Sequence, residues 1–364
     1  MYTRRRFLEI SALGTAGAAV STIPGCVETN QPLVEIFPSS TFFTRRANAL
    51  TVNFCGILSP QVERARYRLT NGAWNKVPQG LPRVPKPLFT IELSAHDLLE
   101  GSNTLTIEAT SQQGRTKVFE KEFIYDPSPI ELPLTVSWSN NKNLDVQDGY
   151  WETFEQEQEW RIRPKPGFEE YDRIVNVTGA FSGGRRVETD VVFRDPGWLG
   201  WRGKRAYGFG VLTLWGGHLE KTAIRPRRGW SFGIAWFFAP RRSPEQEEEP
   251  GLILGCGHKQ GRERSKRVFE HVPLIPQKDT QYSVIAEAFP ITGADGRFLY
   301  WRQRLKWWKA GTPEPKQWMV MDDNKQGGSL LPEAEYAVSL LAHRTQVEFG
   351  TVTVKPLEST VMDS

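Results

Sequence analysis

Three runs of alternating residues between positions 185 and 238 constrain the fold more than any other feature of this chain. In the first run, Arg185–Phe193, apolar side chains alternate with the charged side chains of Arg186, Glu188 and Asp190. Successive side chains of a β-strand point to opposite faces, so this pattern predicts a strand with one packed and one polar face. The runs 207–215 and 230–238 carry an aromatic or β-branched residue at every second position and predict two further strands. Because they follow one another in sequence, we expect the three strands to pair as sheet neighbours.

The rest of the chain also reads as short strands, and no long segment has the 3.6-residue period of an α-helix. Its 25 Pro and 32 Gly are scattered rather than clustered, which suits many strands joined by turns. We expect a small β-sandwich over 31–126, a proline-rich linker over 127–133, a larger sandwich over 134–357 and a tail over 358–364. The predicted fold class is therefore all-β, with two sandwiches in series.

The amino-terminal residues have the pattern of an export signal. Arg4, Arg5 and Arg6 precede an apolar stretch that is too short for a comfortable membrane span, and Pro24-Gly25-Cys26 follows it. Residues 1–26 resemble a twin-arginine export signal that ends in a bacterial lipoprotein box. This resemblance implies that Cys26 is lipidated, that the bacterial membrane is a partner, and that the protein is a periplasmic, outer-membrane or cell-surface lipoprotein. A cleaved, soluble export signal is the alternative.

Composition and motif spacing exclude several other classes. The net charge is +4 over 364 residues, so there is no broad basic field for nucleic acid. No Cys and His spacing predicts a zinc site, and no glycine-rich phosphate loop is present, so no metal or cofactor is expected. Asp322-Asp323-Asn324 offers oxygen ligands for calcium, but a polar turn accounts for it as well. Cys55 and Cys256 are expected to be free rather than bridged.

Both expected sandwiches resemble known domain families. The segments YRLTNGAW (67–74) and LLEGSNTLTIEATSQQG (98–114) resemble immunoglobulin-like or fibronectin-type-III-like modules of bacterial surface proteins, which serve as spacers or docking pieces. Trp151, Trp160, the Arg186-Val187-Glu188 strand and the closing HRTQVEFGTVTVKPL (343–357) resemble the concanavalin A-like lectin/glucanase superfamily. This second resemblance implies a jelly-roll of two curved antiparallel sheets, of which the concave one binds sugar. The superfamily contains lectins, glycanases, lyases and inert modules, so fold alone does not settle function.

The expected carbohydrate site centres on the turn Trp215-Gly216-Gly217-His218. Two glycines allow the backbone to approach a ligand closely, Trp215 offers a stacking face, and His218 offers a hydrogen bond. Arg186 and Glu188 are expected to bind sugar hydroxyls beside this turn. Further candidate binding residues are Trp230, Trp236 and His343. Of the adjacent Trp307 and Trp308, one must point to each face of its strand, so one is expected to be exposed.

The catalytic motif of laminarinase-like enzymes of this superfamily, Glu-x-Asp-x-x-Glu, is incomplete. Glu188 and Asp190 match its first two acids and are the only catalytic candidates, whereas Phe193 stands in the third position. Hydrolysis would need an acid from another strand, such as Glu287 or Glu348. The sequence therefore favours an exported, lipid-anchored carbohydrate-binding protein. A glycoside hydrolase or polysaccharide lyase is one alternative, and a structural cell-envelope protein that binds another protein is the other.

Overall fold

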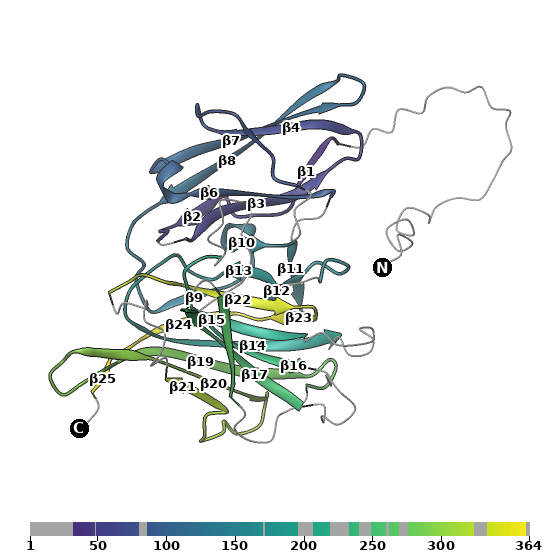
Figure 1. Cartoon of the computed structure of the whole chain (residues 1–364). Coiled ribbons are helices and arrows are strands. Elements are labelled where there is room, and N and C mark those ends of the chain that lie inside the picture. The colour runs from purple at the N-terminus through teal and green to yellow at the C-terminus, as the bar shows by residue number, and fades with distance from the viewer. Residues whose placement is uncertain are drawn as a thin grey trace, which may run out of the picture. The chain divides into compact units, whose positions relative to one another are not determined.

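The computed structural model describes residues 32–361, except for 48, 80–85, 170–171, 196–206, 219–232, 240–248, 260–261, 269–275 and 324–332. In this described part, all regular structure is β apart from two short 3-10 turns, Ala95–Asp97 and Asn141–Asn143 (Figure 1). No helix of the described part is long and apolar enough to cross a membrane. The expected all-β fold class is therefore confirmed, while the export signal and Cys26 lie outside the described residues.

The first strands form a small sandwich of two sheets. One sheet has the order β1 (Val34–Ile36), β3 (Thr51–Leu58) and β6 (Leu88–Ser94). The other has the order β2 (Phe42–Thr44), β8 (Thr116–Asp126), β7 (Gly101–Ser111), β4 (Val62–Leu69) and β5 (Asn75–Lys76). The rings of Phe43, Phe54 and Phe123 meet between the two sheets, with centroids 5.2–5.7 Å apart. This aromatic contact fills the core of the small sandwich.

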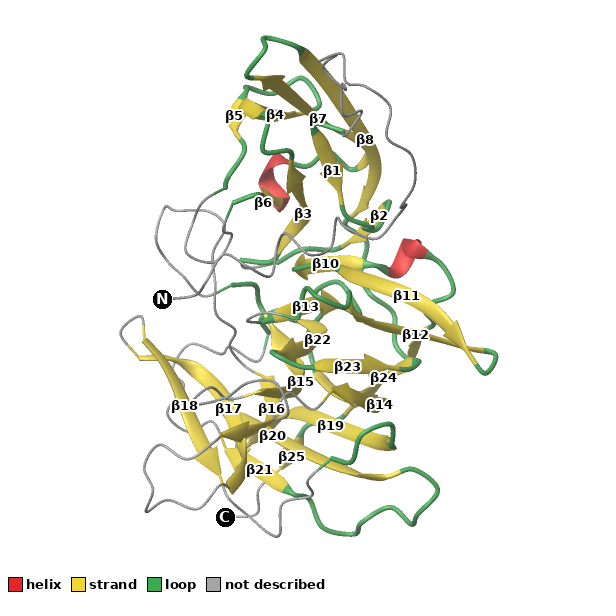
Figure 2. Ribbon diagram, turned by 90° about the vertical axis from the view of Figure 1, so that its right-hand side faces the viewer, coloured by secondary structure: helices red, strands yellow, loops and turns green. Residues whose placement is uncertain are grey.

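The later strands form a large sandwich, also of two sheets (Figure 2). The seven-stranded sheet has the order β10 (Asp145–Asp148), β13 (Arg173–Asn176), β22 (Ala337–His343), β15 (Tyr207–Trp215), β16 (Gly233–Ala239), β17 (Glu249–Lys259) and β18 (Arg262–Val268). The ten-stranded sheet has the main order β11 (Trp151–Gln156), β12 (Glu159–Pro164), β23 (Gln346–Phe349), β14 (Gly184–Asp195), β19 (Gln281–Thr292), β20 (Phe298–Lys309) and β21 (Val320–Asp323). Three short strands complete it: β9 (Leu134–Val136), β24 (Val352–Leu357) and β25 (Thr360–Val361).

The alternation in β14 has the expected consequence. Val187, Val191 and Phe193 are buried between the two sheets, where Phe193 meets Phe209 of β15 with ring centroids 5.7 Å apart. The expected pairing of the three runs is wrong for the first of them, however. Strands β15 and β16 do pair, but β14 pairs with β19, β23 and β24 and thus belongs to the opposite sheet. Consecutive strands of a sandwich often cross between layers, and local periodicity does not record such a crossing.

The closing segment HRTQVEFGTVTVKPL is interrupted at Gly350 rather than forming one strand. Strands β23 and β24 both line the same edge of β14, and the carboxylate of Asp190 packs over Gly350 between them. A Cβ atom at position 350 would lie 2.0 Å from Asp190 Oδ2, so a larger residue there would have to displace this carboxylate.

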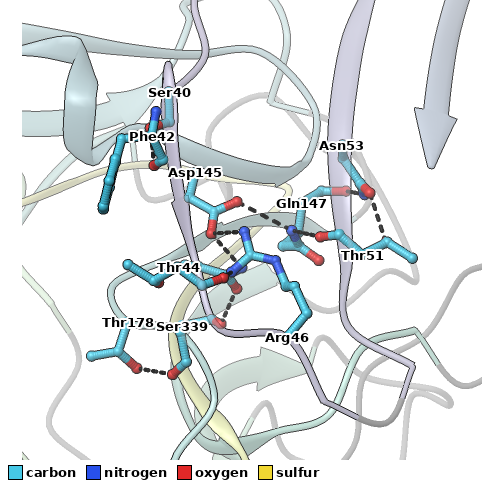
Figure 3. A network of polar contacts seen from close by, with 12 residues as sticks. Ser40, Phe42, Thr44, Arg46, Thr51, Asn53, Asp145, Gln147, Thr178 and Ser339 are labelled. Carbon is cyan, nitrogen blue, oxygen red and sulfur yellow. Dashed lines mark hydrogen bonds and ion pairs between the residues drawn. The ribbon is translucent and has the colours of Figure 1, made fainter. Parts of the chain in front are cut away.

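The small sandwich is packed against the large one, and both belong to one compact unit, Leu33–Ser364. Leu50 packs with Ile174, Leu212, Trp215 and Leu341 in one apolar cluster on the seven-stranded sheet. Beside this cluster lies a polar network in which Arg46 binds Asp145 and Asn53 binds the backbone of Gln147 (Figure 3). The small sandwich therefore covers part of the large one.

Candidate functional site

The Trp215-Gly216-Gly217-His218 turn is an internal contact of the fold. The Trp215 side chain is 0% exposed and His218 is 3% exposed, and their rings meet edge to face with centroids 5.2 Å apart. A sugar ring stacks only on an indole face that solvent can reach. The expectation that Trp215 stacks on a ligand is therefore wrong. The burial of His218 likewise contradicts its expected place at the rim of a ligand site.

The two glycines do allow a close backbone approach, but to another part of the chain. Gly217 has φ +95°, and a Cβ there would lie 2.2 Å from the carbonyl oxygen of Ala49. The Ala49 amide donates to the Gly216 carbonyl oxygen at 3.0 Å. The sequence correctly marks a position where backbones approach closely. The backbone that approaches these glycines is that of Ala49 in the small sandwich. Local patterns do not encode this contact, because the two segments are far apart in sequence.

The remaining candidate binding residues are His343, Trp230 and Trp236. His343 is buried, with Nδ1 2.6 Å from Asp172 Oδ1 and Nε2 2.7 Å from Arg344 Nη1. These contacts fix the imidazole at the end of β22, which corrects its assignment as a ligand-binding group. Trp230 lies outside the described residues, and Trp236 lies in β16 with its side chain also outside them.

Arg186 and Glu188 instead lie on the outer side of the ten-stranded sheet, opposite the core. In register, Arg186 stands between Glu287 of β19 and Lys355 of β24, and Glu287 faces Arg304 of β20. Directly opposed residues share one face of a sheet, so these side chains form a continuous band. We call this band, together with its extension over β12 and β23, the ion-pair face. Its charged members are Arg161, Arg163, Arg186, Glu188, Asp190, Arg194, Glu287, Arg304, Glu348 and Lys355.

The centre of the ion-pair face is a chain of charge-assisted hydrogen bonds. Lys355 Nζ lies 2.7 Å from Glu188 Oε2, and Arg186 Nε lies 2.6 Å from Glu188 Oε1. Arg186 Nη1 reaches Glu287 Oε1 at 2.8 Å, and Arg304 Nε binds the second Glu287 oxygen at 2.5 Å. Bonds between ionised groups are short and directional, so each side chain is held in one orientation.

The other carboxylates of this face are also paired with cations. Asp190 accepts a hydrogen bond from Arg161, and the almost fully buried Glu348 lies 3.0 Å from Arg163 Nη1 and 2.9 Å from Arg194 Nε. From the sequence, Glu287 and Glu348 are expected only as acids that could replace the missing third carboxylate of the catalytic motif. Their arginine partners stand on other strands, and only the strand order reveals that they meet.

The electrostatics of Glu188 favour its ionised form. Burial raises its pKa, but the hydrogen bonds donated by Lys355 and Arg186 outweigh burial and hold the pKa below the usual range of a glutamate. Burial lowers the pKa of Arg186, but its hydrogen bonds to Glu188 and Glu287 outweigh burial and raise this pKa above the usual range. Glu188 is therefore an acceptor at neutral pH. A general acid requires the opposite shift, which the Glu188 environment does not provide.

Aromatic side chains accompany the ion-pair face. Trp307 is fully buried in the core, whereas its neighbour Trp308 is partly exposed, which confirms the expectation that one of the two faces outward. In register, Trp308 faces Ser283, which in turn faces Asp190 of β14. Trp318 lies beside the same face, with the Arg304 guanidinium 4.3 Å and the Lys306 ammonium 4.7 Å from its ring centroid.

No metal site emerges from the described residues, in which no group of three or more His, Cys, Asp or Glu is placed to hold an ion. Asp322 and Asp323 lie in strand β21 rather than in a turn. The buried Cys55 Sγ lies 3.5 Å from Thr90 Oγ1, and Cys256 lies in β17 with its side chain outside the described residues.

No protein-family model matches this sequence, and no curated protein matches it. Among solved structures, the metal-free carbohydrate recognition domain of Emp46p is 11% identical, covering 56% of this chain and 87% of that chain at a TM-score of 0.33. Carbohydrate-binding module CBM66 from Bacillus subtilis is 12% identical, covering 58% and 95% at 0.31. The basic winged bean lectin with Tn-antigen is 11% identical, covering 61% and 99% at 0.29. Because these TM-scores are low, the assignment of two β-sandwiches rests on the sheets of this chain itself.

Proposed function

We propose that this protein binds carbohydrate, and that the ligand lies on the ion-pair face of the ten-stranded sheet. The observation that carries the proposal is the fixed chain of donors and acceptors around Arg186 and Glu188. Their side chains are 27% and 29% exposed, so a ligand can reach them, yet each is held by at least two charged partners. Such preorganised polar groups lose little conformational freedom when a ligand binds.

The chemistry of this face suits sugar hydroxyls. A hydroxyl both donates and accepts, so it binds a carboxylate and a guanidinium at the same time, and Glu188 and Arg186 offer both groups side by side. The partly exposed Trp308 adds an apolar surface on which a sugar ring can stack. The ring of a second aromatic, Trp318, is engaged by Arg304 and Lys306 and helps to hold these two cations in place.

The same geometry favours binding over hydrolysis. A glycosidase needs one carboxylic acid that stays protonated, beside a second carboxylate. Glu188 has a lowered pKa, and Asp190, Glu287 and Glu348 each accept hydrogen bonds from, or pair closely with, arginines. We therefore assign Glu188 and Asp190 to ligand binding rather than to catalysis.

We further propose that the protein acts as an exported lipoprotein, in the periplasm, at the outer membrane or at the cell surface. The support is the Arg4-Arg5-Arg6 run and the Pro24-Gly25-Cys26 ending of the amino-terminal segment. Metabolic labelling with a fatty-acid analogue tests this proposal, because labelling is expected for the native chain and should be lost in Cys26→Ser. Equal labelling of both chains would contradict it.

A glycan array tests carbohydrate binding, followed by calorimetric titration of the best ligand. Replacing Glu188 by Gln removes a charged acceptor and is expected to weaken binding by about tenfold, the scale of one charge-assisted hydrogen bond. Glu120→Gln, an exposed carboxylate of β8 in the small sandwich, is the matched control and should leave affinity unchanged. Silence across plant, algal and bacterial polysaccharides would contradict carbohydrate binding. Equal affinity of Glu188→Gln would place the ligand elsewhere.

A further inference from the structure

A second charged surface lies on the small sandwich, where strand β4 carries Arg64, Arg66 and Arg68. Alternate residues of a strand share a face, and the intervening Ala65 is buried in the core, so the three arginines point outward together. Lys76 of the neighbouring strand β5 stands directly opposite Arg66 in the sheet register. The resulting group of four cations contains no residue of the ion-pair face.

Trp74, which precedes β5, orders this group. The guanidinium carbons of Arg66 and Arg68 lie 4.4 Å and 4.8 Å from the centroid of its ring. Stacking on an indole holds a guanidinium in place while leaving its N–H groups directed outward for other partners. We call Arg64, Arg66, Arg68, Lys76 and Trp74 the arginine patch.

The arginine patch has more cations than carboxylates. Arg66 binds Glu108 of β7 through two hydrogen bonds, of 2.7 Å and 3.0 Å. Within the described part of the chain, no carboxylate pairs with Arg64, Arg68 or Lys76, and the buried Nε of Arg68 has no hydrogen-bond partner. The next acid on this face, Glu120, stands two strands away from Arg68, about 10 Å by the spacing of strands.

The electrostatics around Glu108 show how cationic this surface is. The hydrogen bonds from Arg66 are the main cause that holds the pKa of Glu108 below its usual range, and the charges of Arg64 and Arg68 lower it further. The ion-pair face differs, since Glu188 and Glu287 there each pair with two cations and Glu348 pairs with three arginines. The arginine patch therefore has charge available for an anionic partner.

We propose that the arginine patch binds a linear acidic polysaccharide through its repeated anionic groups. Arginines two apart along a strand are about 7 Å apart, so they form a row that suits an extended polymer rather than a single ion. The guanidinium fork matches the two oxygens of a carboxylate, sulfate or phosphate group. This site is independent of the neutral hydroxyl recognition proposed for the ion-pair face, because it lies on the other sandwich and recognises charge.

Two other polyanionic partners fit the arginine patch less well. A single-stranded nucleic acid uses open aromatic faces to stack its bases, but the Trp74 ring is engaged by two guanidinium groups. Insertion into an anionic membrane uses projecting apolar side chains, and the exposed large apolar residues of the described chain include none from the arginine patch. Both partners are alternatives that the experiment separates.

The test measures binding of polygalacturonate, a linear polyuronate, to the native chain at low salt. Neutral dextran, a single-stranded oligonucleotide and anionic lipid vesicles are measured in parallel. We expect binding to polygalacturonate alone, weakening steeply as salt is added. Arg64→Gln with Arg68→Gln should weaken binding about tenfold or more, because two of the phosphate- or carboxylate-type contacts are removed. The control Lys117→Gln with Lys278→Gln removes the same charge at exposed positions outside the patch and should bind as the native chain does.

Each other outcome contradicts the proposal. Equal weakening of binding in both double variants would mean that only the net charge of the protein matters. Unchanged binding in Arg64→Gln with Arg68→Gln would mean that the polyuronate binds outside the arginine patch. Binding of the oligonucleotide or the vesicles without the polyuronate would replace the partner class. Glu188→Gln separates this proposal from the one for the ion-pair face, because it should leave polygalacturonate binding unaltered.

Discussion

The junction between the sandwiches and the ion-pair face use the same chemistry, arginine with a carboxylate, in opposite environments. At the junction, the Arg46 side chain is 0% exposed and its Nη2 lies 2.5 Å from Asp145 Oδ2 (Figure 3). The same oxygen also accepts a hydrogen bond from Asn176. On the ion-pair face, Glu188 meets Lys355, whose side chain is 47% exposed. Water screens the second pair but not the first. The buried pair therefore holds the two sandwiches together, while the exposed pairs hold polar groups in position for a ligand.

Among the substitutions that test this difference, Arg46→Ala is expected to lower the free energy of unfolding the most. Removing one partner leaves the buried Asp145 carboxylate without its cation, which costs about 3–5 kcal/mol of the free energy of unfolding. Chemical denaturation of the native and variant chains measures it. A loss below about 1 kcal/mol, the range of an exposed pair, would contradict the role of this pair at the junction.

Gly217→Ala tests the close approach of the two sandwiches. A side chain at φ +95° costs about 1–3 kcal/mol by itself, and the added Cβ also meets the Ala49 carbonyl oxygen at 2.2 Å. Gly114→Ala is the matched control, because Gly114 has φ +79° and no heavy atom within 4 Å of the added Cβ. Thermal unfolding should show the larger loss for Gly217→Ala. Equal losses would mean that the contact with Ala49 adds nothing.

Glu188→Gln should change stability only slightly, by less than about 1 kcal/mol at neutral pH, because Lys355 is exposed and Arg186 is partly exposed. The folded-state pKa of Glu188 is lowered, so its contribution is complete above the ordinary glutamate pKa of about 4.3 and is lost as pH falls through the folded-state pKa. Denaturation of both chains at pH 7 and in acid measures the difference. It should shrink in acid, and a difference that grows as pH falls would contradict the lowered pKa.

Lys355→Ala is expected to have the smallest effect, within about 0.5 kcal/mol, as for an exposed substitution away from the core. Its ammonium is replaced at Glu188 by water, while Arg186 keeps its own bond to that carboxylate. A loss as large as that of Arg46→Ala would remove the distinction between the two regions.

Local alternation predicted most strands of this chain, because one packed and one polar face leave a period of two in the sequence. Val187, Val191 and Phe193 illustrate this, since all three are buried where the pattern places them. Strand β11, in which Trp151, Thr153 and Glu155 alternate with Glu152, Phe154 and Gln156, pairs with β12 over its whole length.

The candidate site was less predictable because its parts are brought together by strand order. Arg186 and Trp215 are near in sequence but lie in opposite sheets, so the expected common site does not form. Arg186 instead meets Glu287 and Lys355, which come from distant strands. Likewise, the sequence marked Gly217 as a position of close backbone approach, but nothing near it in sequence identifies Ala49 as the partner.

The most direct test of ligand binding on the ion-pair face compares a substitution on that face with one in the buried turn. A glycan that binds the native chain is titrated calorimetrically into Arg186→Ala and into His218→Ala, with circular dichroism confirming that both are folded. We expect about a tenfold or greater loss of affinity in Arg186→Ala, the scale of one charge-assisted hydrogen bond, and native affinity in His218→Ala. Native affinity in Arg186→Ala together with a loss in His218→Ala would contradict it and return the site to the turn.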